Sequence, residues 1–306
     1  MKKMILGLLF VAASHLVAGQ IVNVVSVDRL PADVGTFFNP TVSPQGDFLL
    51  VSDAGYSGLV KIDLATNQKT VLSTAISAGY DPVISPDGKK IAFREITYND
   101  RLRYVSVKSI DLDAPKAVVE EMKPTRSFSG MSLASGSLKM AQGKKEISKN
   151  ALRVGQANEM PLLTNEDMLP VIYRNGVRTV VAPNGTDKTY IWASISPNGK
   201  KMVYTVTSPP QCTYVCDIDG KNPVALGYIN APQWIGNENI IGMNDKDDGH
   251  VMLSSTIEVV SIDGKKSQKL TDNSMIAMYP SASADGKVVA FNTVEGGIYI
   301  MNINFK

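Results

Sequence analysis

The sequence predicts an all-β fold, a six-bladed β-propeller with four-stranded blades that spans residues 20–306. Three observations predict it. A hairpin with a Ser-Pro-Asp-Gly-type turn recurs along the chain, a second hairpin follows nearly every copy, and the N-terminal segment supplies the strand that the last unit lacks. Units of about 40 to 50 residues with four strands are typical of propeller blades.

The stretch VISPDGKKIAF, residues 83–93, shows the recurring hairpin most clearly. Pro86 sets φ near about −65° at the second turn position, Asp87 can hydrogen-bond its own backbone, and Gly88 accepts a positive φ. Ile91 and Phe93 place apolar side chains on one face of the strand that follows. The stretch is therefore interpreted as strand, tight turn and strand.

Further copies of the hairpin place the other blades. They occupy residues 40–52, 192–205, 231–244 and 279–293, with turn glycines Gly46, Gly199, Gly236 and Gly286.

Together the two hairpins of a unit give four strands, which we call a to d in chain order. In a propeller the a–b and c–d turns lie on one face, here called the a–b face. The b–c loops and the links between blades lie on the other, the b–c face. Because Ser and Asp vary between copies, the turn is interpreted as scaffold.

Blade three is the least regular unit and is placed at about residues 126–183. Its first half is a degraded copy, GMSLASGSLKMA. Its second half, VIYRNGVRTVV, carries an Asn175-Gly176 turn between alternating strands, which is a strong hairpin signal. The polar stretch between the halves, about residues 142–168, is interpreted as an insertion.

Both ends of the chain predict a closed ring. The last unit stops at GGIYIMNINFK, which is a third strand, so its fourth strand is missing. Residues 21–27, IVNVVSV, precede the first copy of the hairpin by about as many residues as a fourth strand precedes the next copy in other units. This segment should complete the last blade, and such closure hides strand edges that would otherwise aggregate.

Residues 1–19 have the pattern of a secretory signal peptide. Lys2 and Lys3 precede an apolar core, and Ala18 and Gly19 offer a cleavage site. A membrane anchor is the alternative, but the apolar run is short for a span. The predicted protein is exported, periplasmic or associated with the cell envelope, and has no membrane span after cleavage. The formal charge of +2 becomes about zero without the two leader lysines, which gives no argument for nucleic acid.

The two cysteines, Cys212 and Cys216, lie four residues apart. On one extended strand they would be about 13 Å apart, too far for a disulfide. Two free thiols are expected, and a disulfide across a bulge is the alternative that an exported protein would allow.

The hairpins SPDGKKIAF and SPNGKKMVY resemble the repeat of TolB-type propellers, which also occurs in the propellers of prolyl-oligopeptidase relatives. The resemblance covers nearly all of residues 20–306, and only the propeller part of that family. It implies a six-bladed ring that binds a lipoprotein at one mouth. The small α/β domain of TolB has no counterpart in this sequence, and no residue-level motif carries the family's binding site over.

Catalytic machinery is not evident in the sequence. There is no G-x-S-x-G motif, and His250 is the only histidine after the leader, so neither a hydrolase elbow nor a site with two histidine ligands is expected. We predict no catalytic residue, no cofactor and no metal. The loop GMNDKDDGH leaves a weaker calcium alternative on Asp245, Asp247 and Asp248, although its spacing does not match an EF-hand.

The b–c face is the predicted binding face, because varied loops on a rigid scaffold usually carry binding. The candidate contact residues are aromatic side chains near the start of each blade and charged side chains of two b–c loops. They are Tyr80, Arg94, Tyr98, Arg101, Trp192, Trp234, Asp245, Asp247, His250 and Tyr279. Packing between blades is the alternative role for the aromatic residues.

Two functions fit these features. The first is a non-enzymatic scaffold, monomeric by itself, that binds an envelope protein, lipoprotein or peptide. The alternative is a carbohydrate- or small-molecule-binding propeller, including a lyase or hydrolase, which would need aromatic platforms and carboxylates in the channel.

Overall fold

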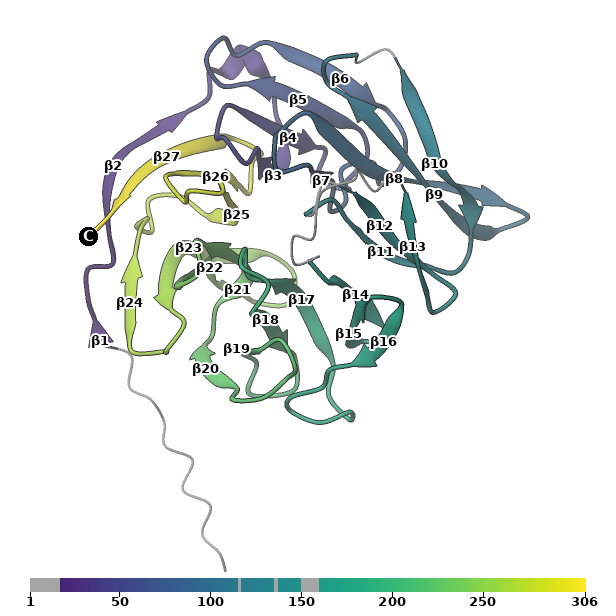
Figure 1. Cartoon of the computed structure of the whole chain (residues 1–306). Coiled ribbons are helices and arrows are strands. Elements are labelled where there is room, and N and C mark those ends of the chain that lie inside the picture. The colour runs from purple at the N-terminus through teal and green to yellow at the C-terminus, as the bar shows by residue number, and fades with distance from the viewer. Residues whose placement is uncertain (1–16, 115–116, 135–136, 150–159) are drawn as a thin grey trace, which may run out of the picture.

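A computed structural model describes residues 17–114, 117–134, 137–149 and 160–306, and these form a ring of β-sheets (Figure 1). Most of the predicted leader, residues 1–16, lies outside the described residues. Among the described residues no helix is long and apolar enough to cross a membrane. The only helix described is the short 3-10 helix η1 (Ala32–Val34).

Seven sheets make up the ring, and we number them as blades 1 to 7 along the chain. Blade 1 contains β3 (Phe38–Val42), β4 (Phe48–Ser52), β5 (Leu59–Asp63) and β6 (Lys69–Ser73). Blade 2 contains β7 (Val83–Ile84), β8 (Lys90–Asn99), β9 (Leu102–Asp111) and β10 (Val118–Thr125). Blade 3 contains β11 (Phe128–Ser132), β12 (Leu138–Gln142) and β13 (Lys145–Lys149). Blade 4 contains β14 (Leu162–Glu166), β15 (Leu169–Arg174) and β16 (Val177–Val180). Blade 5 contains β17 (Tyr190–Ile195), β18 (Lys201–Val206), β19 (Cys212–Asp217) and β20 (Val224–Gly227).

Blade 6 contains β21 (Asn230–Ile235), β22 (Asn239–Asp247), β23 (Met252–Ser261) and β24 (Lys266–Lys269), and β1 (Val17–Ala18) pairs in parallel with β24. Blade 7 contains β25 (Ala277–Ala282), β26 (Val288–Thr293), β27 (Ile298–Phe305) and β2 (Val22–Arg29).

The prediction of six blades is wrong, because the stretch assigned to one blade with an insertion forms two sheets. Strands β13 and β14 lie inside the supposed insertion, and they pair with β12 and β15 respectively. Core packing gives the same number. Seven clusters of buried side chains lie between adjacent sheets, and Ala141 of blade 3 packs against Leu162, Val171 and Tyr173 of blade 4.

Blade 4 escaped prediction because no copy of the recurring hairpin precedes its first described strand in the sequence. The amide of Tyr190, where β17 begins at the b–c face, donates to the carbonyl of Met168 in the β14–β15 turn at 2.9 Å. At the opposite end, Asn175 lines a pocket with Asn198 and Gly199 from the a–b turn of blade 5. Strand β14 therefore runs toward the b–c face, as a second strand does. The Asn175-Gly176 turn is accordingly the c–d turn that the sequence predicted.

The recurring Ser-Pro-Asp-Gly turn is confirmed as scaffold. Ser85 Oγ accepts a hydrogen bond from the amide of Lys90 at 2.8 Å, and Asp87 Oδ1 accepts one from the amide of Lys89 at 3.1 Å. The copies in blades 5 and 7 repeat both bonds. Gly88 has a φ of 73°, which L side chains rarely adopt. The polar turn side chains thus satisfy backbone donors.

Closure of the ring by the N-terminal strand is confirmed. Strand β2 pairs antiparallel with β27 from Val22 opposite Phe305 to Arg29 opposite Tyr299, as the outermost strand of blade 7 (Figure 1). Val22 is fully buried, whereas most other side chains of β2 are exposed. The strand therefore contributes chiefly backbone pairing along the edge of β27.

Both cysteines are free thiols on β19, which confirms the expectation of no disulfide. Cys216 is buried, and burial raises the pKa of its thiol to about 12.

Because the thiolate is the reactive form, we expect Cys212 alone to be alkylated by iodoacetamide in the native protein, at pH 8. Intact-mass measurement should show one adduct before denaturation and two after it; two adducts in the native protein would contradict this packing.

Candidate functional site

A backbone irregularity recurs on the innermost strands where they reach the b–c face. Asn39, Trp192, Ala231 and Tyr279 each have a positive φ between 45° and 53°, and the pairing register with the second strand shifts at each of them. Asp81, just before β7, has a φ of 51°. A non-glycine residue in this conformation costs about 1 to 3 kcal/mol. The ring thus holds different side chains in one rigid backbone frame around its axis.

An arginine lies between two aromatic rings at this end of blade 2. The guanidinium carbon of Arg94 lies 4.7 Å from the ring centroid of Tyr80 and 5.2 Å from that of Phe128 in blade 3. Its Nη2 lies 3.4 Å from the carboxylate of Asp81. Cation–π contact on two sides fixes the plane of the guanidinium. Tyr80 and Arg94, both candidates from the sequence, are therefore in direct contact.

Tyrosines continue this group across blades 1 and 7. The rings of Tyr56 and Tyr80 meet edge to face, with centroids 5.1 Å apart. Burial raises the pKa of Tyr56, and the neighbouring Tyr279 and Tyr80 raise it further. Burial likewise raises the pKa of Tyr279, with a contribution from Asp245 of blade 6. An arc of aromatic and charged side chains thus follows the ring from blade 3 to blade 6.

Asp245 is the buried carboxylate of this arc, at 6% exposure. Its Oδ1 accepts a hydrogen bond from Nδ2 of Asn230 at 2.8 Å, and its Oδ2 lies 3.5 Å from the hydroxyl of Tyr228. Burial raises the pKa of Asp245, and the nearby Asp247 raises it further. No ion pair reaches this carboxylate from the described residues. A buried carboxylate with a perturbed pKa is a candidate for a binding role.

Replacing Asp245 with Asn should stabilise the protein at neutral pH. The raised pKa means that the folded state binds this proton more tightly, so native stability falls as pH rises from about 3.8 through the folded pKa. Asp245→Asn removes that cost and keeps an acceptor for Asn230. We expect a melting temperature higher by about 2 °C at pH 7, with the gain shrinking toward pH 4. Asp28→Asn, at an exposed position on β2, is the control, and an Asp245→Asn protein that melts earlier at pH 7 would refute the assignment.

The acidic loop at the β22–β23 turn does not gather its carboxylates around one point. Asp247 Oδ1 accepts from the amide of Gly249, and Asp248 Oδ1 accepts from the amides of His250 and Val251. Asp245 instead contacts Asn230. Within residues 17–306, leaving out the gaps, no group of three His, Cys, Asp or Glu is placed to hold a metal ion. The exposed loop carboxylates therefore cap the turn.

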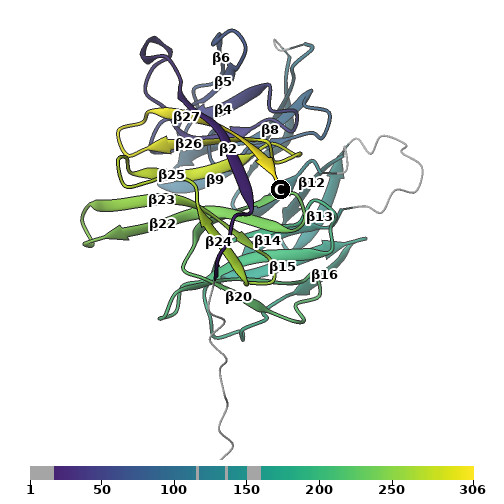
Figure 2. The same cartoon turned by 90° about the vertical axis from the view of Figure 1, so that its left-hand side faces the viewer.

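Large exposed hydrophobic side chains are concentrated on the b–c face. They are Ile76, Tyr80, Tyr98, Leu102, Met168, Trp192, Tyr228, Val251, Leu253 and Val294. The a–b face has fewer in the described chain, namely Val118, Val177 and Phe305, and the rest lie along outer strands. Two long hairpins, β8–β9 and β22–β23, carry four of the exposed hydrophobic residues of the b–c face. Figure 2 shows the β22–β23 hairpin projecting beyond the neighbouring strands. This concentration makes the b–c face the candidate interaction surface.

The structure separates the predicted candidates into three groups. Tyr80, Arg94, Asp245 and Tyr279 belong to the arc described above. Tyr98, Arg101, Asp247 and His250 lie at exposed hairpin tips, and Trp192 occupies the strained inner position of blade 5. Trp234 packs among the apolar side chains between blades 5 and 6, and its indole N–H donates to the carbonyl of Ser194 at 3.3 Å.

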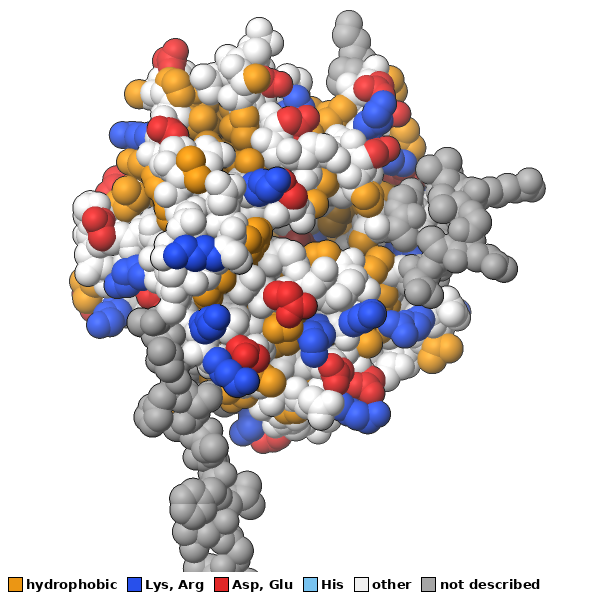
Figure 3. All heavy atoms as spheres, turned by 60° about the vertical axis from the view of Figure 1, so that its left-hand side comes forward, with side chains coloured by type: hydrophobic (Ala, Val, Ile, Leu, Met, Phe, Trp, Pro, Cys, Tyr) orange, Lys and Arg blue, Asp and Glu red, His pale blue; other side chains and the backbone are white. Residues whose placement is uncertain are grey.

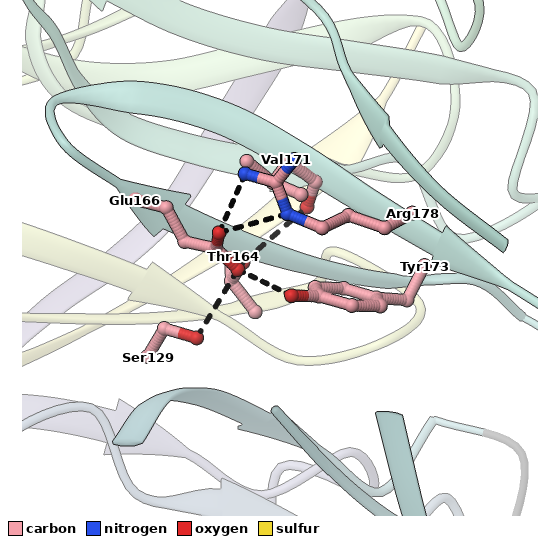
Figure 4. Close-up of polar contacts among 6 residues, drawn as sticks. All are labelled: Ser129, Thr164, Glu166, Val171, Tyr173 and Arg178. Atoms are coloured by element: carbon pink, nitrogen blue, oxygen red, sulfur yellow. Dashed lines mark hydrogen bonds and ion pairs between the residues drawn. The ribbon is translucent and has the colours of Figure 1, made fainter. Parts of the chain in front are cut away.

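Sequence reasoning missed a buried polar cluster that joins blades 3 and 4 (Figure 4). Glu166 accepts hydrogen bonds from the hydroxyl of Tyr173 at 2.5 Å and from Nε and Nη2 of Arg178 at 3.0 and 2.7 Å. Ser129 on β11 and Thr164 contact the same carboxylate at 3.4 Å. Burial and Glu166 raise the pKa of Tyr173 to about 12. A fully satisfied carboxylate of this kind positions the two sheets.

The flank of the ring that carries β2 and β24 has mixed charge. Figure 3 shows Lys and Arg interspersed with Asp and Glu on this side, together with scattered hydrophobic side chains. This pattern agrees with the near-neutral charge of the predicted mature chain. The b–c face differs from it in its concentration of exposed apolar residues.

Comparison with known proteins supports the fold. No protein-family model matches the sequence, and no curated protein matches it. An oligogalacturonate lyase in complex with manganese has 15% identity and a TM-score of 0.51, with 88% of this chain and 78% of that chain covered. TolB from Acinetobacter baumannii has 15% identity and a TM-score of 0.55, covering 80% of this chain and 56% of that one.

A TolB candidate from Agrobacterium tumefaciens has 14% identity and a TM-score of 0.55, covering 94% of this chain and 99% of that one. At such identities the likeness concerns the fold alone. The chain is a β-propeller that is TolB-like in its architecture.

Proposed function

We propose that this propeller is a non-enzymatic scaffold of the cell envelope that binds a protein or peptide on its b–c face. The observation that carries the proposal is the concentration of exposed large hydrophobic side chains on that face, against three on the a–b face among the described residues. Aromatic and aliphatic side chains of this kind form the energetic centre of protein interfaces. The leader-like residues 1–19 support export, and an envelope protein or lipoprotein is the proposed partner.

The geometry of the face suits an extended or looped polypeptide. The rigid inner strands hold Trp192 and Tyr279 in fixed backbone positions, while Tyr98 and Leu253 project from the two long hairpins. Rigid anchors lose little conformational freedom on binding. We infer that the hairpins provide apolar contacts and that the arc near the axis provides polar ones.

Surface variants test this proposal. Tyr98→Ser and Leu253→Ser should each reduce recovery of a co-purifying polypeptide from envelope extract about tenfold, since hot-spot truncations cost about 1 to 2 kcal/mol or more. Val177→Ser, an equally exposed hydrophobic on the a–b face, is the matched control and should leave recovery unchanged.

The carbohydrate-binding alternative makes a different prediction. An exposed Trp192 and the buried carboxylate of Asp245 are the groups that a sugar would use. A signal on a glycan array that Asp245→Asn abolishes, with no polypeptide recovered by the unmodified protein, would replace our proposal with that alternative.

A further inference from the structure

Arg94 is a cation with too few partners for its surroundings. Its side chain is only 11% exposed, and the rings of Tyr80 and Phe128 cover the guanidinium. Within the described chain its one hydrogen-bond acceptor is Asp81, at 3.4 Å from Nη2. Charge-assisted hydrogen bonds of arginine are usually about 2.7 to 2.9 Å long. The Nε atom is buried with no partner among the described residues.

The charge around Arg94 favours an additional anion. Among the described residues Asp81 is the only carboxylate paired with Arg94, and the side chain of Asp81 is 71% exposed, so water competes for that contact. Burial lowers the pKa of Arg94, and the nearby Arg103 lowers it further, which places two positive charges close together. The guanidinium stays protonated even so. One exposed carboxylate thus offsets the charge of Arg94, which also lies near a second arginine.

We propose that Arg94 binds a carboxylate of the polypeptide ligand, an Asp or Glu side chain that replaces Asp81 at the guanidinium. This inference rests on the proposed peptide-binding function and names the ligand chemistry. The two flanking rings leave the edge of the guanidinium as its approach, and a planar carboxylate matches that edge with two parallel hydrogen bonds. Exposed Tyr80, whose ring lies against the guanidinium, supplies apolar contact beside the charge.

The deciding variant is Asp81→Asn, because it should improve binding. Asn tolerates the left-handed backbone of this position, where φ is 51°, at least as well as Asp does. Removing the negative charge frees Nη2 for the ligand. The measurement is a peptide array in which each peptide with Asp or Glu is paired with its Asn or Gln counterpart. We expect the Asp81→Asn protein to bind the acidic peptides about threefold or more tightly than the unmodified protein does.

Loss variants complete the test. Arg94→Gln should cut binding of the acidic peptides about tenfold and leave the amide peptides unchanged, and circular dichroism would check its fold. Lys200→Gln, the same charge change on the a–b face, should alter neither set. Raising the NaCl concentration from 50 to 500 mM should weaken the binding of the acidic peptides and leave the binding of the amide peptides unchanged.

The outcomes separate this inference from the function it rests on. If the unmodified protein binds acidic and amide peptides equally, or if Asp81→Asn has no effect, the carboxylate assignment is wrong while peptide binding stands. If no peptide binds but oligogalacturonate does so in an Arg94-dependent manner, both the peptide ligand and the proposed function are overturned.

Discussion

A chain that begins at Leu30 is expected to lose most of its native stability, whereas one that begins at Gln20 should melt like the full chain. Strand β2 pairs with β27 from Val22 to Arg29 and closes blade 7. Each hydrogen bond of such a ladder contributes about 1 kcal/mol net, and burial of Val22 contributes about 2 kcal/mol. The expected loss is about 5 kcal/mol, which lowers the melting temperature by more than about 10 °C.

A point variant separates closure from mere shortening. Val22→Asp keeps the length of the strand but puts a charge where the side chain is fully buried, and it should reproduce much of the loss. Exposed Val25→Asp on the same strand is the matched control and should have little effect. Thermal unfolding followed by circular dichroism measures all four chains, and equal melting of the Leu30 and Gln20 chains would show that β2 does not close the ring.

The second large effect is expected at Glu166, which joins blades 3 and 4. Glu166→Ala leaves the guanidinium of Arg178 and the buried hydroxyl of Tyr173 without their acceptor. Removal of one partner from charged hydrogen bonds of this part-buried kind costs about 2 to 3 kcal/mol. We expect urea unfolding to show a loss of this size with an unchanged denaturant slope, which would indicate that the native fold is retained.

The double variant Glu166→Gln, Arg178→Gln tests whether charge is responsible. It removes both charges, keeps the side-chain shape at position 166 and leaves no unpaired guanidinium at position 178, so it should be less destabilised than Glu166→Ala. If the single and double variants lose the same stability, the carboxylate does not act through Arg178.

The pH dependence at Glu166 has a defined sign. Burial pushes the pKa of this carboxyl upward, but the hydrogen bonds from Tyr173 and Arg178 outweigh burial, so its pKa lies below the ordinary 4.5. The stability from this group is therefore complete above about pH 4.5 and is lost as the pH falls through the folded pKa. The difference between the native protein and Glu166→Gln should shrink as the pH falls below 4.5.

The fold class was predictable because turn chemistry repeats in the sequence. Ser-Pro-Asp-Gly-type turns place Gly at a positive φ, and recognisable variants recur between the first and second strands of most blades. The sequence before blade 4 carries no such motif. The β14–β15 turn, on the b–c face, uses Asp167 and Met168, both with positive φ, and not the Asn-Gly or Asp-Gly pairs that mark two-residue hairpins. The blade count therefore failed where neither turn signal was present to mark a separate sheet.

The candidate site was predictable in part for a different reason. Blade topology placed Tyr80, Arg94, Asp245 and Tyr279 on the b–c face, because each lies near a loop of that face. The partners of these residues come from other blades. Phe128 stacks on Arg94 from blade 3, and Tyr56 belongs to blade 1. Such contacts depend on how blades pack around the ring, which no local pattern records.

Site-specific photocrosslinking tests the central claim most directly. Benzoylphenylalanine placed at Tyr98 or Leu253, on the b–c face, should form a discrete protease-sensitive adduct with a polypeptide when irradiated in an envelope fraction. The same probe at Val177, on the a–b face, should form none. Adducts of equal yield from Val177, or none from either b–c position, would contradict a polypeptide-binding b–c face.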